Sequence, residues 1–63
     1  MEILTWQARR KCGLTLQQLE ALTGIGKTTL NNIENGRVSP TLKQLETIAR
    51  ALDMHINDLY ESE

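Results

Sequence analysis

Four polar side chains recur between residues 27 and 32 at three- and four-residue spacings. These spacings place Lys27, Thr28, Asn31 and Asn32 on one face of a helix. Leu30 and Ile33 fall on the opposite, apolar face. Asparagine pairs bidentately with adenine, and lysine donates to guanine O6 and N7. We therefore expect these four polar residues to contact base edges.

Two short helices must position this face. Thr15 and Gln18 form a T-x-x-Q capping box, which predicts a helix over Leu16–Thr23. Gly24 ends that helix, and the next is expected over Lys27–Asn35. The sequence therefore predicts two helices joined by a tight turn.

The rest of the chain also has helical patterns and no strand signal. Thr41 and Gln44 repeat the capping box before an apolar face formed by Leu42, Leu45, Ile48, Ala49 and Leu52. Asp53 and Met54 make a short break. The further expected segments are a first helix over Ile3–Cys12, a loop over Gly36–Pro40 and a last short helix over Ile56–Tyr60. We expect an all-α fold: a five-helix orthogonal bundle in one domain, residues 1–63.

Length and composition limit the function classes. A chain of 63 residues forms a single core. Cys12 is the only cysteine, so no intrachain disulfide forms, and its stripe with Leu4 and Ala8 predicts a core position. The sequence has no long apolar run and no signal-peptide pattern, so we expect a cytoplasmic protein. His55 is the only histidine, and no metal site is expected.

The charge is unevenly distributed. The formal net charge is −1, but the segment from Asp53 onward carries four acidic and no basic residues. Residues 1–52 hold seven basic against four acidic residues, a formal charge of +3. A modestly basic body with an acidic end is compatible with binding to DNA.

A series of short motifs carries a family resemblance over Leu4–Tyr60. The motifs are Arg9, GLT at 13–15, Leu19, TGI at 23–25, TTL at 28–30, IENG at 33–36, SPTL at 39–42 and IARAL at 48–52. In these motifs the chain resembles the Xre/Cro/cI-type helix-turn-helix family of transcriptional regulators. IENG followed by SPTL at this spacing is a fairly specific signal.

The resemblance implies a lambda-repressor-like domain with its helix-turn-helix motif at about residues 15–35. Its third helix would enter the major groove of DNA. Gly24 matches the turn glycine, and the four polar residues named above match the base-facing positions. Arg9 and Glu34 match a buried ion pair between the first and third helices.

Three residues depart from the family pattern. Leu16 stands where relatives often have a phosphate-contacting glutamine, so we expect that contact to be lost or replaced by backbone N–H groups. Glu20 stands where a small alanine lets the two helices approach, so we expect it to point outward or alter the crossing. Gly26 replaces the usual serine or threonine cap of the third helix.

A second set of polar residues is expected to contact the sugar–phosphate backbone. Helix N-termini bind phosphate through free N–H groups, and basic side chains neutralise it. Capping alone would also explain the two threonines that begin helices. The expected phosphate contacts are Thr15, Gln17, Thr29, Asn35, Arg37, Thr41 and Lys43.

The leading functional hypothesis is that the protein binds double-stranded DNA sequence-specifically and regulates transcription. The resemblance implies a repressor, the most frequent role in the family. It would bind an inverted-repeat operator as a homodimer, with recognition helices about 34 Å apart. The acidic tail with Leu59 and Tyr60 is a candidate dimer surface. The alternative is a protein-interaction module of the same fold, such as an antitoxin or an adaptor. We expect no enzymatic activity, cofactor, small-molecule ligand or membrane partner.

Overall fold

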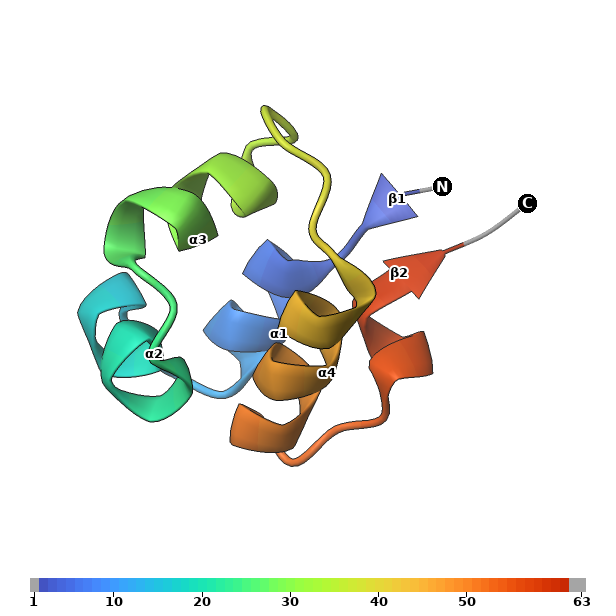
Figure 1. Ribbon diagram of the computed structural model, residues 1–63. Helices are drawn as coiled ribbons and strands as arrows, with labels where there is room; N and C mark the ends of the chain where they lie inside the picture. The colour runs from blue at the N-terminus through green and yellow to red at the C-terminus, as the bar shows by residue number, and fades with distance from the viewer. Residues whose placement is uncertain (1, 62–63) are drawn as a thin grey trace.

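The computed structural model describes residues 2–61 and contains four α-helices (Figure 1). Their bounds are α1, Thr5–Lys11; α2, Leu16–Thr23; α3, Lys27–Glu34; and α4, Leu42–Ala51. α2 packs against both α3 and α4, and α1 contacts α3. The helix-turn-helix pair α2–α3 lies on one side of the molecule in Figure 1, across from the chain ends.

Side-chain caps begin two of the helices as the sequence predicts. Thr15 Oγ1 accepts from Gln18 N–H, and Gln18 Oε1 accepts from Thr15 N–H at 2.8 Å. Thr41 and Gln44 form the same reciprocal pair at the start of α4. Each pair satisfies backbone donors that the first helical turn leaves free. Both capping boxes are confirmed.

Left-handed residues end the helices. Gly24 has φ of 74° and donates its N–H to Glu20 O at 2.8 Å, which closes α2. Asp53, with φ of 56°, ends α4, and Met54 N–H then donates to Ala49 O at 2.8 Å. The short break expected after α4 is therefore a helix-ending motif that tolerates aspartate.

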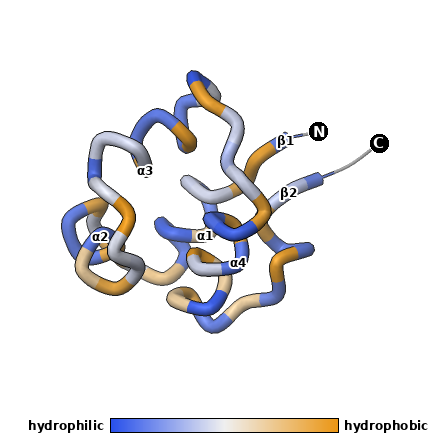
Figure 2. The backbone as a smooth tube through the Cα atoms, viewed as in Figure 1, coloured by the Kyte–Doolittle hydropathy of each residue, from blue (hydrophilic) through white to orange (hydrophobic). Residues whose placement is uncertain are grey.

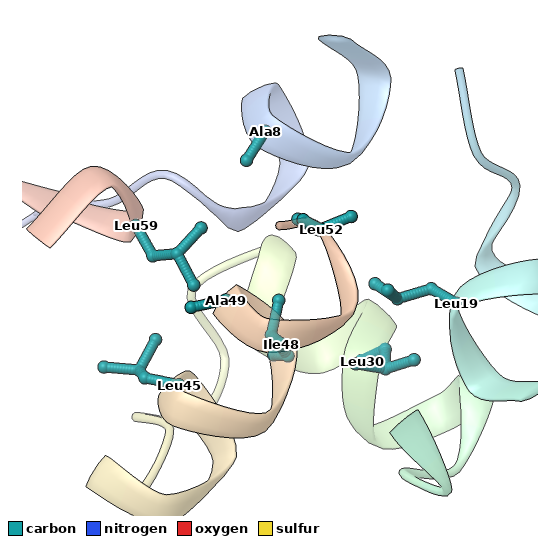
Figure 3. Close-up of a cluster of buried hydrophobic side chains, with 8 residues drawn as sticks. All are labelled: Ala8, Leu19, Leu30, Leu45, Ile48, Ala49, Leu52 and Leu59. Atoms are coloured by element: carbon teal, nitrogen blue, oxygen red, sulfur yellow. The ribbon is translucent and has the colours of Figure 1, made fainter. Parts of the chain in front are cut away.

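The core is aliphatic and is drawn in Figure 3. It forms where α1, α2, α3, α4 and the chain's last turn meet, and consists of Ala8, Leu19, Leu30, Leu45, Ile48, Ala49, Leu52 and Leu59. Leu19, Ile48 and Leu59 have no exposed surface. Orange and blue segments alternate along the tube in Figure 2, as expected where each helix has one buried and one solvated face.

The expected five-helix count is wrong for the described residues. Ile56–Leu59 forms a 3₁₀ helix, η1, of one turn in place of a fifth α-helix. The first helix begins at Thr5 because Glu2–Ile3 forms a strand, β1. β1 pairs antiparallel with β2, Tyr60–Glu61, with Ile3 opposite Tyr60. This two-stranded ladder brings the two ends of the described chain together (Figure 1).

Three apolar residues are more exposed than the helical pattern predicts, and a fourth is too buried for the role expected of it. Cys12 is exposed, because α1 ends at Lys11 and Cys12 is its C-cap. Leu22 is 58% exposed, and Leu42, the first residue of α4, is 69% exposed. Leu59 is fully buried, so it cannot contribute to the expected dimer surface. Within residues 2–61, no helix has the length and apolar character needed to span a bilayer.

Candidate nucleic-acid interface

The polar face of α3 is accessible at its first turn and half-buried further along. Lys27 and Thr28 are exposed, whereas Asn31 and Asn32 are half-buried. Leu30 and Ile33 are each 1% exposed and hold the opposite face in the protein. The structure therefore brings the four expected base-contacting residues onto one face, with the two asparagines closer to the protein body.

The two asparagines differ in their partners. Asn31 Oδ1 accepts a hydrogen bond from Asn35 Nδ2 at 3.2 Å, so its oxygen is already engaged. Among the described residues, the Asn32 side chain has no hydrogen-bond partner. Bidentate pairing with adenine requires the amide oxygen and the amide nitrogen together. Asn32 therefore has both groups available, while Asn31 would have to share its acceptor.

The α2–α3 turn is held by two side chains of α2. Thr23 Oγ1 donates to Leu19 O at 2.8 Å and accepts from Ile25 N–H at 3.1 Å. Glu20 Oε2 accepts from Lys27 N–H at 3.0 Å. Glu20 thus turns toward α3 and caps the helix that Gly26 leaves without a side-chain cap.

Residues at the start of α2 and the end of α1 surround one hollow. Arg10 and Thr15 line it together with Gly13, Leu14 and Leu16. Leu16 also packs against the core, so its side chain cannot replace a phosphate-contacting glutamine. Thr15 and Gln17 are both exposed at the first turn of α2. Arg10 is an exposed basic residue beside this turn, and no sequence motif singled it out.

The start of α4 lies beside the α2–α3 turn. Thr41 and Lys43 line a hollow with Thr23 and Ile25. Thr41 and Lys43 are exposed. Although far apart in the sequence, the N-terminal turn of α4 and the helix-turn-helix turn therefore share one surface.

The remaining phosphate candidates lie in the first turn of α3 and just beyond its end. Thr29, in the first turn, is half-buried. Asn35 and Arg37 are exposed, and Arg37 N–H donates to Asn32 O at 2.9 Å. This bond directs the chain away from α3 after Gly36, whose φ is 73°. The Arg37 side chain therefore lies just beyond the C-terminal end of the polar face.

An ion pair joins α1 to α3 behind the polar face. Arg9 Nε lies 2.7 Å from Glu34 Oε2, and Arg9 Nη2 donates to Glu34 Oε1 at 3.0 Å. Arg9 Nη1 also donates to Leu14 O at 2.8 Å. The two side chains are 11% and 3% exposed. The ion pair that the family resemblance implies is present. Its burial favours a structural role over contact with a ligand.

No group of three histidine, cysteine or carboxylate side chains comes together within residues 2–61. His55 precedes η1, where its N–H donates to Asp58 Oδ2 at 3.1 Å. This contact places His55 at the start of η1.

A family model described as helix-turn-helix matches residues 7–59. The chain belongs to the helix-turn-helix family, in its Xre/Cro-type branch. The matched range contains all four α-helices of the helix-turn-helix domain except the first two residues of α1.

Similar proteins have names that agree with this family. An uncharacterized HTH-type transcriptional regulator of Methanothermobacter thermautotrophicus is 38% identical over 61 residues, 95% of the chain and 88% of that protein. The regulator y4dJ of Sinorhizobium fredii is 41% identical over 44 residues, 70% and 57% of the two chains. A regulator of Archaeoglobus fulgidus is 33% identical over 52 residues, 82% and 74%.

Proposed function

We propose that this helix-turn-helix protein is a sequence-specific regulator that inserts α3 into the major groove of double-stranded DNA. The observation that carries the proposal is the division of α3 into a buried apolar face and a polar face that begins with exposed Lys27 and Thr28. A major groove about 12 Å wide accepts one α-helix, and side chains of these types hydrogen-bond to base edges.

Asn32 is the proposed principal reader. Its amide has no partner within the described residues, so it can present acceptor and donor together to adenine N6 and N7. Lys27 donates to guanine or to an adjacent phosphate, and Thr28 contacts the neighbouring base. Asn31 has a secondary part in this proposal because Asn35 engages its oxygen.

The proposed phosphate contacts surround this face. Thr15 and Gln17 approach one strand at the start of α2, and Thr41 and Lys43 approach it at the start of α4. Asn35 and Arg37 lie beyond the end of α3, and Thr29 lies in its first turn. Such contacts fix the register of the protein on DNA, while base contacts select the sequence.

We further propose that the protein acts in the cytoplasm as a homodimeric repressor on an inverted repeat. α3 has eight residues and is therefore only about 12 Å long, which limits one domain to a few base pairs. Two copies whose α3 helices lie about 34 Å apart would contact twice as many base pairs and recognise an inverted repeat. Occupancy of a promoter by the dimer would then block transcription.

An unbiased selection of duplex sequences tests this function. We expect an enriched site with two related half-sites in opposite orientation, and a log Kd that rises with log salt concentration by about 0.9 per phosphate contact. Sedimentation of the bound complex should give two protein chains per duplex. Binding of every duplex no better than an unrelated acidic polymer would reject DNA recognition.

The same experiment discriminates the alternative of an interaction module such as an antitoxin or an adaptor. The observation that supports an interaction module is the exposure of Leu22 and Leu42. Exposed apolar side chains favour protein contact over contact with phosphate. A module of this kind would show no enriched duplex and no salt-dependent DNA affinity.

A further inference from the structure

Glu20 belongs to α2, but its side chain reaches the helix that is proposed to contact bases. Its carboxylate accepts a hydrogen bond from the first N–H of α3, Lys27 N–H, at 3.0 Å. The same residue's backbone oxygen accepts from Gly24 N–H at 2.8 Å. Glu20 therefore contacts both the residue that ends α2 and the residue that begins α3.

The three helix starts on the proposed interface carry different caps. α2 and α4 are capped by neutral threonine–glutamine pairs, which add no charge. α3 begins at Gly26, which has no side-chain cap, and a carboxylate from another helix supplies the acceptor. Only α3 thus has a full negative charge at its first turn.

That charge opposes the two positive contributions at the same turn. A helix N-terminus is equivalent to roughly half a positive charge, and the Lys27 ammonium adds one more. The Glu20 carboxylate cancels much of this potential and already occupies one of the N–H groups that would bind an anion. DNA phosphate is therefore disfavoured at the backbone N–H groups of this turn.

We propose that Glu20 is a positioning residue that fixes the first turn of α3 and excludes phosphate from the backbone N–H groups of that turn. The exclusion leaves the side chains of this turn free to approach the DNA and assigns phosphate binding by helix N-termini to the starts of α2 and α4. The exclusion rests on the proposed DNA-binding function, whereas the fixing of α3 does not.

Glu20→Gln and Glu20→Ala separate the hydrogen bond from the charge. Glutamine keeps an oxygen acceptor for Lys27 N–H and removes the charge, whereas alanine removes both. In thermal melts of the isolated protein, we expect Glu20→Gln to keep the parent Tm and Glu20→Ala to lower it by several degrees. An unchanged Tm in Glu20→Ala would overturn the capping role.

Asp58→Asn is the matched control for charge. Asp58 Oδ2 also accepts from a backbone N–H at a helix start, that of His55 at 3.1 Å. Its helix, η1, contacts α1, α4 and β2, away from the α2–α3 pair (Figure 1). Both variants therefore lose one negative charge and keep an acceptor, but only Glu20 lies at the proposed interface.

Affinity for a fluorescent duplex of mixed sequence is then measured over a salt series. We expect Glu20→Gln to bind about three- to tenfold more tightly than the parent at low salt, with a steeper salt dependence, and Asp58→Asn to match the parent. On the selected duplex, Glu20→Ala should lose sequence preference that Glu20→Gln retains, because α3 is then less firmly held.

The outcomes that contradict the proposal are distinct. Equal affinities of Glu20→Gln and the parent, or equal gains in Glu20→Gln and Asp58→Asn, would overturn the exclusion of phosphate. If neither parent nor variant bound any duplex, the proposed function would fail and the exclusion with it. The order of the Tm values would still decide whether Glu20 fixes α3.

Discussion

The guanidinium of Arg9 and the carboxylate of Glu34 meet in a bidentate ion pair that ties α1 to α3, with N–O distances of 2.7 and 3.0 Å. The pair lies behind the polar face of α3, and Arg9 also binds Leu14 O at the end of α1. One side chain thus fixes α3 and the approach to α2 together. The pair orients the interface without touching it.

Removing one partner of this pair should destabilise the protein strongly. Glu34→Ala leaves the Arg9 charge buried and unpaired, which typically costs about 3–5 kcal/mol. Small domains have few kilocalories to lose, so we expect the Tm to fall by more than about 15 °C or the cooperative transition to disappear. Thermal melts followed by circular dichroism measure this loss.

The double variant Arg9→Met with Glu34→Leu is the control. It removes both charges. Its loss of unfolding free energy should therefore be smaller, by at least about 1 kcal/mol, than the summed losses of the single variants Arg9→Met and Glu34→Leu. A Glu34→Ala protein that melted within a few degrees of the parent would contradict a structural role for the pair.

Thr5 provides an opposite prediction, in which a substitution stabilises the fold. Its side chain is 1% exposed, and its hydroxyl has no hydrogen-bond partner among the described residues. Valine has the same shape and removes the unpaired polar group, so Thr5→Val should raise the free energy of unfolding by about 1 kcal/mol. Urea denaturation measures the change.

Thr5→Ser is the matched comparison, because it keeps the hydroxyl and loses a buried methyl. We expect it to be less stable than the parent by about 0.8 kcal/mol. A Thr5→Val protein less stable than the parent would indicate that the hydroxyl has a partner after all.

The terminal ladder places two like charges directly opposite each other. Glu2 and Glu61 are register partners in the β1–β2 pair, and both are exposed. Like charges in such positions are destabilising, and an opposite-charge pair contributes roughly 0.2–1 kcal/mol. Glu61→Lys should therefore raise the Tm at low salt, with a gain that shrinks as salt screens the pair.

The double variant Glu2→Lys with Glu61→Lys restores the like-charge arrangement. Its Tm should return toward that of the parent, because two lysines then face each other. A double variant as stable as Glu61→Lys alone would show that the gain came from net charge rather than from the cross-strand pair.

Local chemistry made the helix starts and stops predictable. Thr15 and Thr41 each bind a glutamine three residues ahead, so the signal and the contact lie in the same short segment. Gly24 ends α2 because a left-handed residue is needed there, which glycine adopts without strain. These features need no knowledge of the tertiary fold.

The features that the sequence did not predict depend on distant partners. The β1–β2 ladder joins residues 2–3 to residues 60–61, and strands of two residues have no periodicity to detect. The Glu20 side chain caps Lys27, seven positions ahead, whereas it was expected to point outward or to alter the helix crossing. Cys12 continues the apolar stripe of α1, but α1 ends at Lys11 and the Cys12 side chain is exposed.

Within the candidate interface, the sequence predicted which residues share the polar face, but not which of them have free hydrogen-bonding groups. The spacing predicted that Asn31 and Asn32 share it, and only the contact from Asn35 distinguishes them. Arg10 was missed because its place beside Thr15 depends on how α1 meets α2.

Asn32→Ala, Asn31→Ala and Arg37→Ala should change DNA binding in three different ways. We expect Asn32→Ala to lose about 1–3 kcal/mol of discrimination at one base pair of the selected site, with smaller losses for Asn31→Ala. Arg37→Ala should weaken binding to all duplexes alike and reduce the salt slope by about 0.9, because its contact is to phosphate. Binding to the selected duplex, to single-base variants of it and to a mixed-sequence duplex measures the three effects. A uniform loss in Asn32→Ala, or a base-specific loss in Arg37→Ala, would contradict the proposed division between base reading and backbone anchoring, because each contact type has its own dependence on sequence and salt.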